Sequence, residues 1–211
     1  MIWRALTLCL ALGACSNAPD FADPASVVLQ SFRGQQKEFS PRFLHLLRAK
    51  APTLQVGFIE QKTSANLLLE RQDAAFAYWL TADGAHIILQ SGMLHSTRGV
   101  GEGLLASELS QPLALVGGMQ GGWSDRFHTY LDGNDNAISR TYRCLIENEG
   151  VKEITLLDGP TNTILMTENC RSLDQQFLNF YWVNQTSGAI LLSRQWAGPE
   201  VGQVSIRTVP R

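Results

Sequence analysis

The stretch FAYWLTADGAHIILQ, residues 76–90, decides the fold class expected for this chain. It holds two short apolar runs, 76–80 and 86–90, which are rich in aromatic and β-branched side chains. Between them lie Ala82, Asp83 and Gly84, and an Asp-Gly pair between two such runs is a strong signal for a tight hairpin turn. The stretch therefore predicts two antiparallel strands joined by a turn.

Similar strand and turn signals follow along most of the remaining chain. Further strands are expected at residues 138–147, 151–157, 164–170, 178–183, 189–196 and 203–209, with turns at 148–150, 158–160 and 185–188. Short strands at even spacing predict a mainly β fold, either an antiparallel sandwich or a barrel-like domain. Residues 98–122 are richer in glycine and less regular, and within them residues 101–109 could form a short helix.

One or two short helices are expected before the strands, within residues 24–51. An Asp-Pro pair at 23–24 has the pattern of a helix start, and this first helix would end near Gly34. A Ser-Pro pair at 40–41 repeats the pattern, and apolar residues at helical spacing follow it until Pro52.

The beginning of the chain has the order of features found in a bacterial lipoprotein signal. One positive charge, Arg4, precedes an apolar run at 5–14, which is too short to span a bilayer and has the length of a signal-peptide core. Small residues then lead to Cys15 in LGACS, residues 12–16, which resembles a lipobox cut before the cysteine. We expect a cleaved signal peptide at 1–14 and acyl chains on Cys15. The alternative is a plain secretory signal with an incidental cysteine.

Lipidation would hold the mature protein at a membrane. Several acyl chains bind a bilayer almost permanently, because each buried CH₂ contributes about 0.8 kcal/mol. In Gram-negative sorting, an aspartate after the lipidated cysteine retains a protein at the inner membrane. This chain has Ser16 there, which favours the outer membrane, on its periplasmic side. Residues 15–23 would then be a tether and residues 24–211 a single β-rich domain.

Charge and hydropathy argue against nucleic-acid binding and against a transmembrane helix after the signal peptide. The net charge is −2, with acidic and basic residues mixed along the chain. No basic stripe indicates nucleic-acid binding. No later apolar run is long enough for a transmembrane helix.

Two cysteines, Cys144 and Cys170, are expected to form a disulfide. They are left as a pair once Cys15 carries lipid, in a compartment that permits disulfides. Alternation within each expected strand points both sulfurs inward, which fits a bridge between two strands separated by one hairpin. Zinc would need four ligands and no histidine lies near these cysteines in the sequence, while a Cys-His nucleophile has no motif to support it. We expect no metal site and no cofactor.

Motifs for catalysis are absent from the sequence. The chain has no G-x-S-x-G elbow, no HExxH and no phosphate-binding loop in its proper context. Asp132 and Asp135 could form a carboxylate pair for glycoside chemistry, with Glu168 as another candidate, but Asp-Gly and Asn residues in such a segment more often form a tight turn. A polysaccharide-modifying enzyme therefore stays an alternative, and no catalytic residue is assigned.

Polar and aromatic residues gather near the C-terminus. Aromatic rings with fixed amide and guanidinium donors can stack on sugars and bind their hydroxyls, but the same residues can also be core packing. The candidate recognition surface consists of Asn179, Tyr181, Trp182, Arg194, Gln195 and Trp196.

Several segments together resemble the group 4 capsule polysaccharide lipoprotein family (GfcB/YjbF/YmcC type). They are DGAHIILQSGMLHSTRGVG (83–101), YLDG (130–133), TYRC (141–144), ENC (168–170), YWV (181–183) and SRQWAGPEVG (193–202). The resemblance runs from the lipobox almost to Arg211.

The resemblance implies a barrel-like β domain with N-terminal helices, in an outer-membrane lipoprotein of exopolysaccharide or capsule secretion. It implies a large outer-membrane β-barrel protein and small periplasmic proteins of the same gene cluster as partners, with polysaccharide as a possible ligand. It carries over no catalytic activity. We expect a non-catalytic component that docks a partner or binds glycan. A structural assembly factor for an outer-membrane β-barrel is a further alternative.

Overall fold

A computed structural model describes residues 39–209 apart from 132–133, 135 and 157. The expected signal peptide, Cys15, the tether, the helix at 24–34, Asp132 and Asp135 lie outside the described residues. The elements are α2 (Pro41–Arg48), β1 (Thr53–Phe58), β2 (Thr63–Asp73), β3 (Phe76–Leu80), β4 (His86–Gln90), β5 (Met93–Arg98), β6 (Leu104–Glu108), α3 (Ser110–Gly117), β7 (Gly122–Leu131), β8 (Ala137–Leu156), β9 (Gly159–Arg171), β10 (Gln176–Asn184), β11 (Ile190–Trp196) and β12 (Gln203–Thr208). The mainly β prediction is confirmed.

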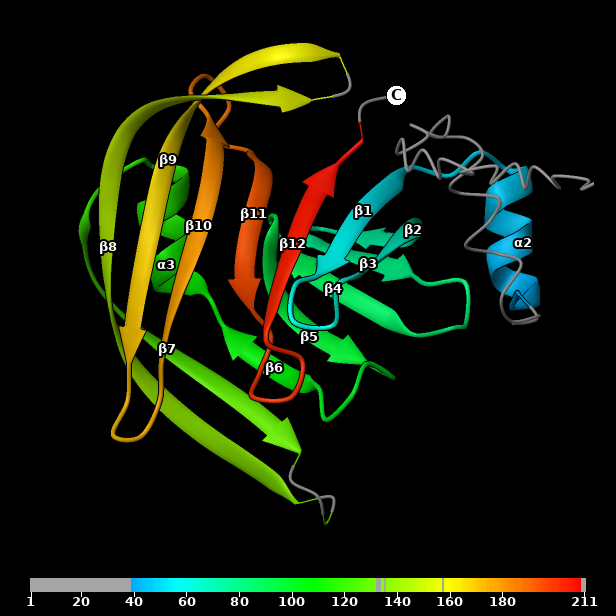
Figure 1. The fold of residues 1–211 in the computed structure, drawn as a ribbon, viewed down its shortest axis with the longest axis horizontal. Helices are drawn as coiled ribbons and strands as arrows, with labels where there is room; N and C mark the ends of the chain where they lie inside the picture. Colours follow the sequence, from blue (N-terminus) through cyan, green and yellow to red (C-terminus); the bar gives the residue numbers. More distant parts are fainter. Residues whose placement is uncertain (1–38, 132–133, 135, 157, 210–211) are drawn as a thin grey trace, which may run out of the picture. The chain divides into compact units, whose positions relative to one another are not determined.

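The strands form one twelve-stranded antiparallel sheet that nearly closes on itself. Its order is β5-β4-β3-β2-β1-β12-β11-β10-β9-β8-β7-β6, so that the first strand pairs with the last, as the cyan β1 and red β12 show in Figure 1. Its two edges, β5 and β6, share no ladder of backbone hydrogen bonds among the described residues. The ring of His95 on β5 instead meets the backbone oxygen of Ser107 on β6 at 2.9 Å. The fold is therefore barrel-like rather than a sandwich.

The prediction of a helix after Ser40 is confirmed in α2. The Ser40 hydroxyl accepts a hydrogen bond from the backbone N–H of Phe43 at 3.2 Å, which caps the helix start. Phe43 then packs with Leu68 on β2 and Leu80 on β3, so α2 covers part of the outer face of the sheet. No helix in the described part of the chain is long and apolar enough to cross a membrane.

The prediction of a short helix at 101–109 is wrong, because most of this segment is β6. Strand pairing with β7 overrides the local pattern there. The helix in this region is α3, which begins just afterwards. Its Val116 packs inside the sheet with Leu109, Met93 and Tyr181.

The prediction of a turn at 148–150 is also wrong, because β8 continues through it. These residues form a bulge opposite β9, where the register shifts between Asn148 and Val151. Gly150 takes a left-handed backbone angle (φ +80°), and its N–H donates to the side-chain oxygen of Asn148 at 2.8 Å. The turn-favouring residues are thus accommodated in a bulge, and the chain does not reverse its direction there.

The predicted disulfide between Cys144 and Cys170 is confirmed. The two residues are directly opposite one another on the hydrogen-bonded strands β8 and β9. Both side chains are buried, beside Tyr142 and Phe177.

Replacing both cysteines with serine should lower the free energy of unfolding by roughly 3.5 kcal/mol, since the bridge closes a loop with a sequence separation of 26. Urea denaturation of the full-length protein measures this loss. Wild-type protein denatured with a thiol reductant should show a similar loss. An unchanged midpoint in both would contradict a stabilising bridge.

Candidate functional site

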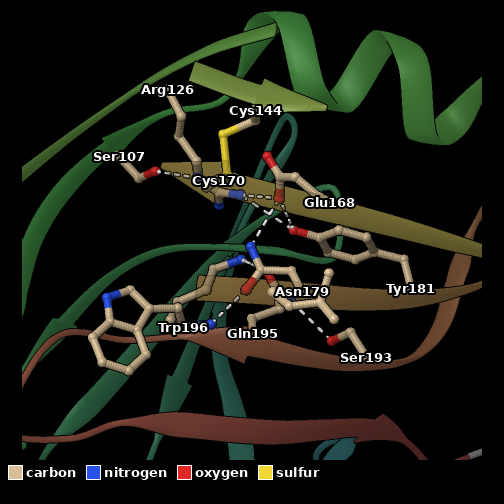
Figure 2. Close-up of polar contacts among 12 residues, drawn as sticks. Ser107, Arg126, Cys144, Glu168, Cys170, Asn179, Tyr181, Ser193, Gln195 and Trp196 are labelled. Atoms are coloured by element: carbon tan, nitrogen blue, oxygen red, sulfur yellow. Dashed lines mark hydrogen bonds and ion pairs between the residues drawn. A yellow bond between two sulfur atoms is a disulfide. The ribbon is translucent and has the colours of Figure 1, made fainter. Parts of the chain in front are cut away.

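Charged and polar side chains meet inside the sheet, where alternation points one residue in two toward the interior. Arg126 comes from β7, Glu168 from β9, and Asn179 and Tyr181 from β10 (Figure 2). Asn179 lies directly opposite Glu168 in the strand register. We call this set, with Ser107, His128 and Tyr130, the interior network.

Glu168 is the centre of the interior network. Its Oε2 accepts hydrogen bonds from Tyr181 Oη at 2.7 Å, from Asn179 Nδ2 at 2.8 Å and from a guanidinium nitrogen of Arg126. Burial lowers the pKa of Arg126, but Glu168 together with Tyr181 and Tyr130 more than offsets this, and the net shift is upward. Arg126 is therefore held as a cation beside the Glu168 carboxyl group.

His128 extends the interior network as a neutral ring. Its Nε2 accepts from Arg126 Nε at 2.9 Å, so the proton is on Nδ1, which donates to Tyr130 Oη at 2.6 Å. Burial and the adjacent Arg126 charge hold the pKa of His128 well below its ordinary value. The ring also stacks on Phe177, which stacks on Trp196, with centroid separations of 5.7 and 5.8 Å.

A metal ion does not suit this part of the interior. Among the described residues, Cys144, Glu168 and Cys170 are the one group of metal-ligand side chains within 4.8 Å of one another. Both sulfurs are oxidised in the disulfide, so neither is a thiolate ligand.

The interior network is closed to substrates. Arg126 is 1% exposed and Glu168 is fully buried. Three donors bind Oε2 of the carboxylate, while Oε1 is buried without a hydrogen-bond partner among the described residues. Such an arrangement fixes strand positions rather than offering an acid or base to a polymer.

The expected C-terminal recognition surface is divided between two faces of the sheet. Asn179, Tyr181 and Gln195 are buried in the interior, because alternation turns every second residue of β10 and β11 inward. Trp182 is half-buried and Arg194 is exposed, both at outward positions. These residues therefore do not form one continuous surface, and Trp196 lies partly buried on Phe177.

The buried Gln195 has a clear structural role. Its Oε1 accepts from the backbone N–H of Leu94 at 2.8 Å, and its Nε2 donates to the oxygens of Gly92 and Ser193 at 3.1 and 2.9 Å. It thus links β11 across the interior to β5.

A small cleft of about 190 Å³ lies between the loops before β6 and before β12. Its lining includes the exposed carboxylates Glu102 and Glu200 and the guanidinium of Arg140. Glu200 Oε2 accepts from the backbone N–H of Glu102 at 3.2 Å. Glu168, the described carboxylate that the sequence suggested for catalysis, is not among its lining residues.

A larger open groove lies on the outer face of the sheet beside α2, and sequence reasoning missed it. Its volume is about 500 Å³. We call it the arginine groove; its lining residues are Arg42, Glu70, Arg71, Tyr78, His86, Ile88 and Arg98. In the strand register, Tyr78 on β3 pairs with Arg71 on β2 and with Ile88 on β4. Two residues before Ile88 on β4, His86 pairs with Arg98 on β5.

A bulge shapes one side of the arginine groove. The β2–β3 register shifts between Leu69 and Arg71, so the consecutive residues Glu70 and Arg71 both line the groove. Glu70 binds Arg42 through Oε1 and His86 through Oε2, the latter at 2.9 Å. Burial raises the pKa of Glu70, but the hydrogen bonds from His86 and Arg42 more than offset this and lower it overall.

Comparison with known proteins identifies similar chains. A family model described as "Group 4 capsule polysaccharide lipoprotein gfcB, YjbF" matches residues 28–209. The crystal structure of the hypothetical lipoprotein YmcC from Escherichia coli (K12) has a similar fold, with a TM-score of 0.68 and 18% sequence identity, covering 88% of this chain and 94% of that chain. At this identity the likeness concerns the fold alone. No curated protein matches the chain.

Glu168→Gln should lower the free energy of unfolding by about 3–5 kcal/mol, because it leaves the buried Arg126 without its counter-charge. Urea denaturation gives the value. The control Glu153→Gln, at an exposed position on β8, should stay within about 0.5 kcal/mol of wild type. A Glu168→Gln protein as stable as the control would contradict a coupled pair.

His128 should make folding stability depend on pH. The pKa of His128 is lowered in the folded state. Below about pH 6.5, the ordinary pKa of histidine, the unfolded chain therefore binds a proton that the folded chain does not, and the free energy of unfolding decreases as the pH decreases. Between about pH 7 and pH 5 the wild type should lose about 2 kcal/mol more than His128→Gln, by urea denaturation at each pH. Parallel pH curves for the two proteins would refute a neutral buried His128.

Proposed function

The chain belongs to the group 4 capsule polysaccharide lipoprotein family, and on that premise we propose that it is an outer-membrane lipoprotein that takes part in secreting or assembling an exopolysaccharide or capsule. We assign it a non-catalytic role, in which it docks a partner protein or binds glycan. Such a family belongs to the cell envelope. Its position at the periplasmic side of the outer membrane is our inference from Cys15 and Ser16.

The observation that carries this proposal is the extent of the family match. Residues 28–209 take in the whole described sheet and both of its helices. The capsule-related role of the family therefore concerns the complete β domain and not an appended segment.

Burial supports a binding role over a catalytic one. Glu168 is inside the sheet and bound to Arg126, while the arginine groove is open to solvent. The outer face also exposes large side chains that suit contacts with a partner protein: Trp123 is 59% exposed and Phe127 is 47% exposed. The partners we propose are an outer-membrane β-barrel protein and periplasmic proteins of the same secretion cluster.

Deleting the gene should reduce the polymer exported to the cell surface, and wild-type protein should restore it. Cys15→Ser should neither restore export fully nor incorporate an alkyne-tagged palmitate, because the acceptor thiol is gone. Ser16→Ala, next to the acceptor, is the matched control and should be labelled and active. Unchanged export in the deletion strain would overturn the proposed role, and labelling of Cys15→Ser would overturn the anchor.

A further inference from the structure

We propose that the arginine groove binds a carboxylate-bearing sugar unit of the polymer, with Arg71 and Arg98 as the carboxylate ligands. The identification of the ligand as part of a polymer rests on the proposed function. The recognition of a carboxylate rests on the groove itself.

The charges of the arginine groove are unbalanced. Glu70 is its one carboxylate, and this group is already engaged by Arg42 and His86. Within the described residues, Arg71 and Arg98 form no ion pair with any carboxylate. Two arginines thus line the same open groove without a carboxylate partner among the described residues.

Arg71 is oriented by the aromatic ring beneath it. Its guanidinium carbon lies 3.9 Å from the centroid of the Tyr78 ring, a cation–π contact that orders the side chain. The bulge at Glu70 puts Arg71 on this face of the sheet. An ordered guanidinium presents a planar fork of N–H donors that matches a carboxylate in two hydrogen bonds.

Glu70 orders the polar groups at one wall of the arginine groove. Because it holds both Arg42 and His86, it fixes two further polar groups at the wall of the arginine groove. It also places one negative charge there, beside the two unpaired arginines. A sugar with one carboxylate and several hydroxyls satisfies both features, since hydroxyls can donate to Glu70 while the carboxylate binds the arginines.

The size of the groove suits a sugar. Its volume of about 500 Å³ is within the usual range for small-ligand sites, about 300–1,000 Å³. The net charge of the chain is −2, so the arginines are a local site and not part of a general basic surface.

Calorimetry with the full-length protein in detergent tests this assignment. The probes are a galacturonic acid pentamer and the same pentamer with its carboxylates methyl-esterified. We expect the acid to bind and the ester to bind at least about tenfold more weakly, because esterification removes the charge that the arginines recognise. Equal binding of acid and ester, or no binding of the acid, would overturn the proposal.

Variants locate the site. Arg71→Gln and Arg98→Gln should each weaken binding of the acid about fivefold to tenfold, with unchanged urea midpoints, because both side chains are exposed. Arg171→Gln, at an exposed position on β9 outside the groove, changes the net charge equally and should bind as wild type. A uniform loss in all three variants would indicate non-specific charge and would refute the groove as the site.

The outcome is separable from that of the deletion experiment. Loss of polymer export on deletion, together with no binding of the acid, would overturn the ligand assignment and leave the proposed function intact. Specific binding with normal export in the deletion strain would support the groove and overturn the role in secretion.

Discussion

The buried ion pair between Arg126 and Glu168 is the interaction on which the interior of this fold depends. Arg126 is 1% exposed and Glu168 is fully buried, so each of the two groups needs the other and needs further hydrogen bonds. Those bonds come from different strands, with Tyr181 and Asn179 on β10. A slip of one residue in any of these strands would turn a partner outward and leave a charge unpaired. The pair therefore fixes register as well as closure.

This constraint determines where binding can occur. Arg126, Glu168, Asn179 and Tyr181 bind one another inside the sheet, and the disulfide between Cys144 and Cys170 ties the two strands beside them. Recognition is left to the outer face. There the bulge at Glu70 gathers cationic groups that the protein itself does not neutralise. The sheet thus has a buried network of paired charges inside and a groove with unpaired positive charges outside.

The sequence predicted much of the architecture and little of the groove. Residues 76–90 fold as the expected hairpin, because this signal is local, and the expected disulfide forms between Cys144 and Cys170, the pair left once Cys15 is assigned to lipid. The polar and aromatic residues between 179 and 196 were predicted to form one surface because they are close in the sequence. In a strand, however, neighbouring side chains point to opposite faces of the sheet, so these residues are divided between the interior and the outer face. Arg71 and Arg98 come together only through the register of four strands and a bulge, which no local pattern reveals.

On the proposed assignment, a ligand binds on the outer face at the arginine groove and leaves the interior unchanged. A nuclear magnetic resonance titration of isotope-labelled full-length protein with the galacturonic acid pentamer tests this most directly. We expect chemical shifts to change at the backbone amides of Arg71, Tyr78, Ile88 and Arg98, while those of Arg126 and Glu168 stay in place. Shifts confined to the interior, or to the cleft lined by Glu102 and Glu200, would contradict it.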